Sequence, residues 1–189
     1  MTESSAGSEA RSRRIAVAGW LILALAGGAA TLPVLGPAHG AIVIGAMLIL
    51  AGLIEVFAGF QRVQARKLAM VAGVVTVIAG LLFTTDQAAK FTPALFIVAG
   101  WLFVRGVTLA AACALEYGSV KFWTGLAASA DFLLAFLLAV GFSAATLVIS
   151  LFGATQQMVA QFAWILALSF LATGAMLLEV AKCAKREDA

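Results

Sequence analysis

The sequence predicts an all-α membrane protein, a bundle of six transmembrane helices made of three tandem helical hairpins. Of its 189 residues, 63% are hydrophobic and only 11% are charged, whereas soluble domains carry about 45–50% apolar and about 25% charged residues. The apolar residues fall into six runs, each close to the roughly 20 residues that cross a bilayer core. Because a backbone exposed to lipid must satisfy its own hydrogen bonds, these runs are expected to be helical.

The six helices are expected at residues 15–35, 40–60, 68–85, 92–115, 121–142 and 157–181. A polar tail, residues 1–14, precedes this transmembrane domain (15–181) and is expected to be disordered and cytoplasmic. Residues 182–189 form a cytoplasmic C-terminal tail. A cleaved signal peptide is an alternative for the first helix, but the apolar run at 15–32 exceeds the roughly 7–15 residues of such segments.

Basic residues lie on one side of the predicted bundle. Of the 12 lysines and arginines, all except Lys90 and Arg105 fall in the two tails, in "QRVQARK" (61–67) or in "EYGSVK" (116–121). The positive-inside rule therefore places both termini in the cytoplasm. The net charge is +3, but the basic residues flank apolar runs, which indicates membrane orientation rather than nucleic-acid binding. The expected partner is therefore the lipid bilayer, and no nucleic acid is expected. Cys113 and Cys183 lie on or near this side and are expected to be reduced.

The connection before the last helix is unusually apolar. Residues 121–153 form a run of about 50 Å if they are one continuous helix, which is longer than the bilayer core. A break is expected near residues 141–143, with "TLVISLF" (146–152) lying at the outer surface. A dip of this segment back into the membrane is the alternative.

Small residues recur at fixed intervals. In the second and third helices the glycines are seven residues apart, and the fourth and sixth helices carry a glycine near the inner third; the residues expected at helix contacts are Gly45, Gly52, Gly59, Gly73, Gly80, Gly106 and Gly174. Small residues let helices approach closely in lipid. Helices 1, 3 and 5 also share similar starts, "AGWLILALAG", "AGVVTVIAGL" and "TGLAASADFL", which predicts three tandem hairpins.

The glycine-punctuated hairpins and "GAMLILAGLIEVFAG" (45–59) resemble the HdeD-type acid-resistance membrane proteins, and "SADFLLAFLL" (129–138) is similar to that family's fifth helix. The resemblance covers about residues 15–181, and the longer 142–157 connection departs from it. It implies a protein of the bacterial inner membrane that is linked to acid or general stress. The family is built from a short repeat of unknown function, so the resemblance transfers no reaction and no catalytic residue.

Three ionisable residues are expected inside the membrane. Asp131 lies ten residues after Lys121, near the midplane, where an ionised carboxylate costs about 2.5–3.5 kcal/mol or more. Arg105 lies 13.5 positions before the centre of the "EYGSVK" turn and Asp131 12.5 positions after it, so antiparallel helices bring them to one depth. The sequence therefore predicts that Arg105 and Asp131 pair, with Glu55 as a second acid about 10 Å inside the cytoplasmic boundary.

The Glu55–Arg105–Asp131 cluster has three interpretations. The favoured one is an internal staple that fixes helix register; a proton- or ion-conducting role and a polar headgroup or solute site are the alternatives. Glu179 is expected to pair locally with Lys182. His39 is expected to be a solvated loop residue, Trp123 and Tyr117 interfacial anchors, and Trp20, Trp101 and Trp164 packing or lipid-facing residues.

The sequence contains no recognisable catalytic signature. It lacks HExxH, CxxC, GxSxG and phosphate-binding glycine loops, and its connections are too short for a soluble catalytic domain. The expectation is a non-enzymatic membrane protein without cofactor or metal, acting in acid or envelope stress. A proton or small-solute channel or transporter that uses the same cluster is the alternative, and a homo-oligomer or a membrane-protein partner stays open.

Overall fold

The structure, a computed structural model, describes residues 2–32, 40–84, 91–152 and 156–186. In these ranges the chain is helical apart from short turns, with α1 (Thr2–Thr31), α2 (Gly40–Phe60), α3 (Arg66–Phe83), α4 (Phe91–Leu115), α5 (Gly118–Phe152) and α6 (Gln156–Arg186). Each helix contains a segment that is long and apolar enough to cross a membrane. The prediction of an all-α, six-helix membrane bundle is therefore confirmed.

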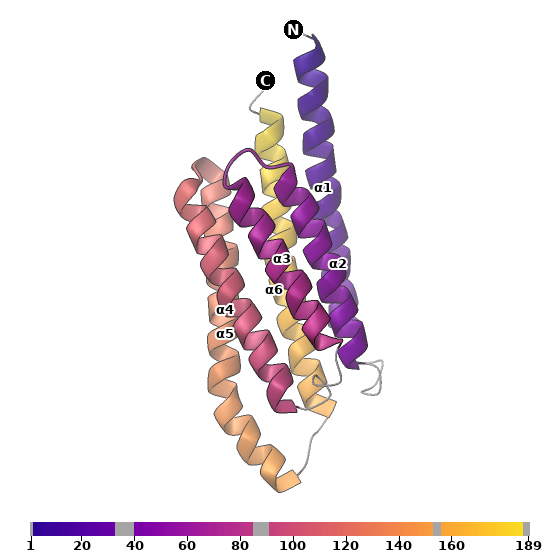
Figure 1. Cartoon of the computed structure of the whole chain (residues 1–189), viewed down its shortest axis with the longest axis vertical. Helices are drawn as coiled ribbons and strands as arrows, with labels where there is room; N and C mark the ends of the chain where they lie inside the picture. Colours follow the sequence, from indigo (N-terminus) through magenta and orange to yellow (C-terminus); the bar gives the residue numbers. More distant parts are fainter. Residues whose placement is uncertain (1, 33–39, 85–90, 153–155, 187–189) are drawn as a thin grey trace.

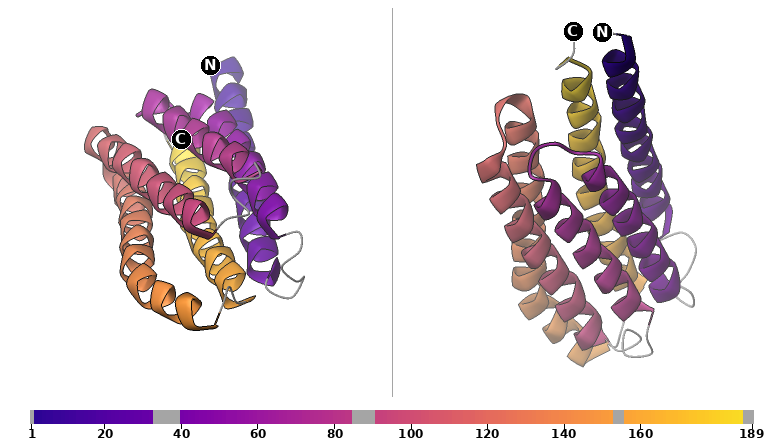
Figure 2. Two further views of the ribbon diagram at one scale, coloured as in Figure 1. Left: turned by 60° about the horizontal axis from the view of Figure 1, so that its bottom comes forward. Right: turned by 45° about the horizontal axis from the view of Figure 1, so that its top comes forward.

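The helices form a closed ring of neighbours. Each one contacts the helix that follows it in the chain, and α1 closes the ring against α6 (Figures 1 and 2). The most extensive contacts join α2 with α3, α4 with α5, and α1 with α6. The predicted hairpins paired helices 1 with 2, 3 with 4 and 5 with 6, so that repeat is not confirmed and the closest pairs are shifted by one helix.

Glycines bring α2 and α3 into backbone contact. A Cβ placed on Gly52 would lie 2.7 Å from the carbonyl oxygen of Gly73, and a Cβ on Gly80 would lie 2.8 Å from the carbonyl oxygen of Gly45. Gly59 packs in the same way against the backbone of Met70. Because lipid offers no hydrophobic force between helices, close approach and dispersion stabilise this pair.

The two other close pairs use fewer small residues. Gly174 of α6 faces Gly19 of α1, where an added Cβ would lie 3.1 Å from the Gly19 carbonyl oxygen. Gly106 of α4 lies against the ring of Phe132 on α5, 3.3 Å from an added Cβ. The glycines selected in the sequence therefore lie at all three close helix pairs, with the densest set between α2 and α3.

Both termini lie at one end of the bundle, together with the α2–α3 and α4–α5 connections (Figure 1). The described basic residues apart from Arg105 lie in or beside these segments: Arg11, Arg13, Arg14, Arg62, Arg66, Lys67, Lys121, Lys182, Lys185 and Arg186. We call this the basic end of the bundle and the other the opposite end.

The helices extend beyond the predicted boundaries at both termini. α1 begins at Thr2, so the expectation of a disordered segment at residues 1–14 differs from the structure. Within these extra turns, the Ser12 hydroxyl donates a 2.7 Å hydrogen bond to the Ala181 carbonyl oxygen of α6. α6 in turn continues to Arg186 rather than ending at residue 181.

The expected break in the fifth helix is absent. α5 runs without interruption over 35 residues, about 52 Å at 1.5 Å per residue. The segment has no proline, and one glycine costs a helix only about 1 kcal/mol relative to alanine, so Gly141 does not end it. The surplus length is accommodated by curvature, since the end of α5 bends toward the side of the bundle where α6 begins (Figures 1 and 2).

We expect Gly52→Ala to lower the free energy of unfolding by about 1–3 kcal/mol, because its Cβ would meet α3 backbone atoms at 2.6–2.7 Å. The measurement is equilibrium unfolding in mixed micelles. Gly27→Ala is the matched control, since an added Cβ at Gly27 meets nothing within 4 Å. Equal stability of the two variants would contradict a backbone contact between α2 and α3.

Candidate functional site: a buried ion-pair cluster

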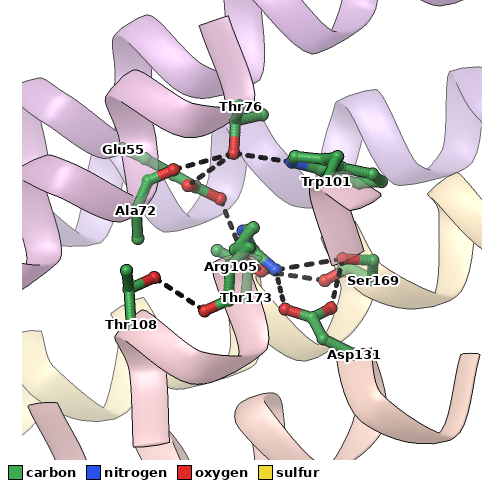
Figure 3. A network of polar contacts seen from close by, with 9 residues as sticks. All are labelled: Glu55, Ala72, Thr76, Trp101, Arg105, Thr108, Asp131, Ser169 and Thr173. Atoms are coloured by element: carbon green, nitrogen blue, oxygen red, sulfur yellow. Dashed lines mark hydrogen bonds and ion pairs between the residues drawn. The ribbon is translucent and has the colours of Figure 1, made fainter. Parts of the chain in front are cut away.

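The side chain of Arg105 lies at the centre of a polar network inside the bundle (Figure 3). The residue is 1% exposed, and its Nη2 donates a 2.7 Å hydrogen bond to Glu55 Oε1 on α2. Its Nη1 donates to Asp131 Oδ2 on α5. The structure thus brings together the three intramembrane residues selected in the sequence, and Arg105 contacts Asp131 as their equal depth predicted.

Two hydroxyl groups of α6 complete the contacts of Arg105. Nη1 also donates a 3.1 Å bond to Ser169 Oγ, and Nη2 donates to Thr173 Oγ1. Ser169 in turn donates a 2.8 Å bond to Asp131 Oδ1, so both carboxylate oxygens of Asp131 are engaged. One guanidinium is therefore bonded to side chains of α2, α5 and α6 from its own position on α4.

The second oxygen of Glu55 connects the network to α3. Thr76 Oγ1 lies 3.4 Å from Glu55 Oε2 and 3.0 Å from the Ala72 carbonyl oxygen, and it accepts a 3.1 Å bond from Trp101 Nε1. Trp101 is only 4% exposed, so it belongs to the packed interior, whereas Trp20 and Trp164 are exposed on the outer surface of the bundle. A buried tryptophan N–H normally needs such a partner.

The hydroxyl residues were missed in the sequence, although a signal was present. Ser169 and Thr173 are the only hydroxyl residues in the apolar span of α6 and are four residues apart, a spacing that places them on one helix face. Thr76 is the only hydroxyl residue within α3. Isolated hydroxyls on separate helices indicate a shared polar contact only when the rotation of each helix is known, and the sequence does not supply it.

A second buried ion pair lies at the basic end and was also missed. Arg62, in the α2–α3 connection, donates from Nη1 to Glu116 Oε1 at 3.1 Å, and the two residues are 6% and 0% exposed. A tight turn with a 3.1 Å bond from Arg62 N to the Gly59 carbonyl oxygen holds Arg62 close to the end of α2. The sequence analysis counted Arg62 only among the basic residues of "QRVQARK" that indicate the orientation.

Burial shifts both partners of this second pair toward their neutral forms. It raises the pKa of the Glu116 carboxyl, although the nearby Arg62 charge acts in the opposite direction. It lowers the pKa of the Arg62 guanidinium, against the attraction of Glu116 and then Glu55. The charge of Glu55 therefore reaches Arg62, which links the two ion-pair groups electrostatically.

Two small cavities are lined by residues of these groups. The outer cavity, about 40 Å³, opens at the basic end and is lined by residues that include Arg11, Arg62 and Glu116. The inner cavity, about 20 Å³, is lined by residues that include Glu55, Arg62 and Arg105. Arg62 is the ionisable residue common to both, so it separates the mouth of the bundle from the central cluster.

The bundle is apolar on the other side of the cluster. Leu48, Leu166 and Phe83 are at most 2% exposed, and Phe162 is 7% exposed; Phe83 and Phe162 pack edge to face with ring centroids 6.5 Å apart. Among the residues whose side-chain burial is described, which leaves out 33–41, 85–95 and 141–161, the buried side chains between the cluster and the opposite end are apolar.

The remaining predicted sites are peripheral. Glu179 pairs with Lys182 at 3.2 Å, as expected, and also accepts a 2.9 Å bond from Ser119. Cys113 and Cys183 are free thiols. His39 and Lys90 lie outside the described residues. Among the residues with described placement, no group of three or more His, Cys, Asp or Glu side chains could hold a metal ion.

Comparison with known proteins returned no family model, no curated protein and no solved structure that matches the chain.

We expect Arg105→Leu to lower the free energy of unfolding by about 3–5 kcal/mol, because Glu55 and Asp131 would be left buried without their cation. Equilibrium unfolding in mixed micelles measures the loss. Lys182→Leu is the control: it removes a lysine whose side chain is 67% exposed, and surface changes stay within about 0.5 kcal/mol. If the two losses are similar, the Arg105 contacts do not stabilise the fold.

Proposed function

We propose that this chain is a non-enzymatic, multi-pass protein of the bacterial inner membrane in which the Glu55–Arg105–Asp131 cluster is a structural staple. The observation that carries this proposal is the bonding of Arg105 to side chains of three other helices. A guanidinium in hydrocarbon is tolerated only where such partners surround it. The cluster therefore fixes the depth and rotation of α2, α4, α5 and α6 relative to one another.

The proposed orientation places the basic end in the cytoplasm. Arg66 and Lys67 lie at the start of α3 and Lys121 in the first turn of α5, on the same side as both termini. The positive-inside rule assigns such an end to the cytoplasm. Lipid covers the outer surface, on which large apolar side chains such as Phe57 and Phe136 are exposed.

A link to acid or envelope stress is part of the proposal through the HdeD-type resemblance of residues 45–59 and 129–138. The contacts support the structural side of that resemblance, since Gly45, Gly52 and Gly59 pack against α3 and Asp131 lies in the interior.

Conduction of protons or small solutes is the second candidate. The two cavities that share Arg62 favour it, because they lead from the basic end to Glu55 and Arg105. A conducting path must also continue to the opposite end, where the buried side chains of the described residues are apolar. The staple therefore agrees better with the part of the interior whose side chains the structure describes.

The staple predicts that an apolar replacement of the whole cluster is tolerated. We expect the triple variant Glu55→Leu, Arg105→Leu, Asp131→Leu to fold and to be more stable than Arg105→Leu alone, because no charge is stranded. The hydroxyls of Thr76 and Thr173 can still bond to carbonyl oxygens within their own helices. Circular dichroism and equilibrium unfolding measure both variants.

Proton flux in liposomes separates the two candidates. We expect wild-type protein and Asp131→Asn to give the same flux across a pH gradient as protein-free liposomes. A wild-type flux that is abolished by Asp131→Asn, in a variant that retains its helical content, would overturn the staple and support conduction.

A further inference from the structure

The outer cavity at the basic end is walled by side chains from four parts of the chain. Arg62 belongs to the α2–α3 connection, Glu116 to the α4–α5 connection, Arg11 to α1 and Cys183 to α6. The volume of about 40 Å³ has room for about three water-sized groups at roughly 10–15 Å³ each. The cavity can therefore admit a small polar group in place of water.

This cavity lies at the depth of the lipid headgroups. The apolar span of α2 ends at Phe60, that of α4 ends at Leu115 and that of α5 begins at Gly118. Arg62 and Glu116 fall in the connections just beyond these ends, where the hydrocarbon core gives way to the polar layer of a membrane. Phospholipid headgroups are therefore the polar molecules nearest to the cavity.

Arg62 offers one edge of its guanidinium to a ligand. The residue is 6% exposed, and its Nη1 donates to Glu116 Oε1. Its Nε and Nη2 are buried and make no hydrogen bond within the described parts of the chain. The N–H groups of these two atoms lie on one edge of the planar guanidinium, and such a fork binds a phosphate or carboxylate through two parallel bonds. Arg62 is therefore suited to hold an oxyanion.

Glu116 supplies an acceptor beside this edge. Its Oε2 is buried and, among the residues with described placement, receives no hydrogen bond. The Thr124 hydroxyl is close enough to favour the ionised carboxylate, but a carboxylate oxygen can accept two bonds. Since a buried acceptor that lacks donors is costly, a ligand that fits the cavity brings a hydrogen-bond donor as well as an oxyanion.

Charge balance requires that this ligand be neutral overall. When Arg11 of the cavity wall is counted, the ionisable side chains of the two ion-pair groups and the cavity comprise three acids and three bases: Glu55, Glu116, Asp131, Arg11, Arg62 and Arg105. A ligand with a net charge would disturb this balance in a region of low dielectric, which is costly. The ligand therefore carries one negative and one positive group.

Among phospholipid headgroups, phosphoethanolamine meets these requirements. It joins a phosphate with one negative charge to a primary ammonium with three N–H donors, so its net charge is zero. Phosphocholine is also a zwitterion, but its quaternary nitrogen carries methyl groups and no N–H. Phosphoglycerol carries the negative charge without a cation.

We propose that the outer cavity binds a phosphoethanolamine headgroup, with its phosphate on the Nε–Nη2 edge of Arg62 and its ammonium on Glu116. The ammonium and two phosphate oxygens fill the room of about three water molecules, and the rest of the headgroup lies at the mouth of the cavity. This site goes beyond the staple, because neither Arg62 nor Glu116 takes part in the bonds of Arg105.

Native mass spectrometry of the wild-type protein in detergent micelles tests the headgroup. The added lipids have identical acyl chains and are phosphatidylethanolamine, its N-methyl and N,N-dimethyl derivatives, phosphatidylcholine and phosphatidylglycerol. We expect phosphatidylethanolamine to be retained severalfold more than phosphatidylcholine and phosphatidylglycerol. Retention should fall with each added methyl group, because each one removes an N–H donor.

Two results with these lipids would overturn the proposal. Equal retention of phosphatidylethanolamine and phosphatidylcholine would show that no donor is recognised. Stronger retention of phosphatidylglycerol would show a site for anions. Because the wild-type protein gives both results, the test does not depend on whether a variant folds.

Arg62→Lys tests the guanidinium edge, because lysine keeps the charge but cannot form two parallel bonds. We expect a severalfold loss of retained phosphatidylethanolamine. Arg66→Lys is the matched control: it is the same change four residues later, at a side chain that lies over the Phe60 ring and lines neither of the two cavities. Equal retention by the two variants would refute the role of Arg62.

Glu116→Gln tests the ammonium contact. The amide removes the negative charge, so the preference for phosphatidylethanolamine over phosphatidylcholine should disappear. Glu179→Gln should keep the preference, because Glu179 pairs with Lys182 and lines neither of the two cavities. A preference that survives Glu116→Gln would contradict the proposed contact.

The two thiols report where the lipid binds. Cys183 lines the outer cavity, whereas Cys113 lines neither of the two cavities, and both are free. Phosphatidylethanolamine should slow the alkylation of Cys183 severalfold relative to phosphatidylcholine and leave that of Cys113 unchanged. Equal rates for Cys183 in the two lipids, or equal slowing of both thiols, would overturn the assigned site.

A soluble headgroup identifies the source of the ligand. Glycerophosphoethanolamine has the same polar group without acyl chains. If it protects Cys183 as well as the lipid does, the cavity takes the headgroup from the aqueous phase. If only the lipid protects, the cavity takes it from the bilayer. Protection by neither would overturn the proposal and would leave the staple, which the unfolding measurements address, unaffected.

Discussion

A guanidinium placed within a bilayer must find its hydrogen-bond partners inside the protein, and this requirement organises the centre of the bundle. Arg105 meets it with two carboxylates and two hydroxyls from α2, α5 and α6. Because each of these bonds requires the two side chains to lie at the same depth and to face each other, α2, α4, α5 and α6 can pack together in only a few arrangements. Glu55 extends the constraint to α3 through Thr76 and the indole of Trp101.

Close packing and charge act on different parts of the ring. Glycines allow α2 and α3 to touch along much of their length, and Gly19 and Gly174 do the same for α1 and α6. These contacts hold the two helices of a pair together, but they do not determine how the pairs pack against one another. The polar network runs across the ring and joins the α2–α3 pair, the α4–α5 pair and α6. Small residues therefore stabilise the helix pairs, and the buried charged side chains determine how the pairs pack against one another.

The number of helices, their approximate limits and the contact between Arg105 and Asp131 could be predicted because they depend on depth, which the sequence encodes as spacing. Contacts that depend on the rotation of each helix about its own axis could not be predicted. Ser169 and Thr173 bond to Arg105 only because of the way α6 is turned. The break expected in α5 was wrong because a mismatch with bilayer thickness does not itself stop a helix, and Gly141 is too weak a breaker. The closest helix pairs differ from the predicted hairpins because the similar sequences at the starts of helices 1, 3 and 5 do not show which neighbour each helix packs against.

The closure of the ring by α1 and α6 has a consequence for biogenesis. Domains fold from the N-terminus as the ribosome delivers them, yet the main partner of the first helix is the last one made. Until α6 has been synthesised, Gly19 of α1 cannot pack against Gly174, and the Ser12 hydroxyl cannot bond to the Ala181 carbonyl oxygen. Arg105 then also lacks its bonds to Ser169 and Thr173. From the insertion of α4 until that of α6, the chain therefore contains a buried cation that lacks part of its hydrogen bonds, and the last helix completes the network.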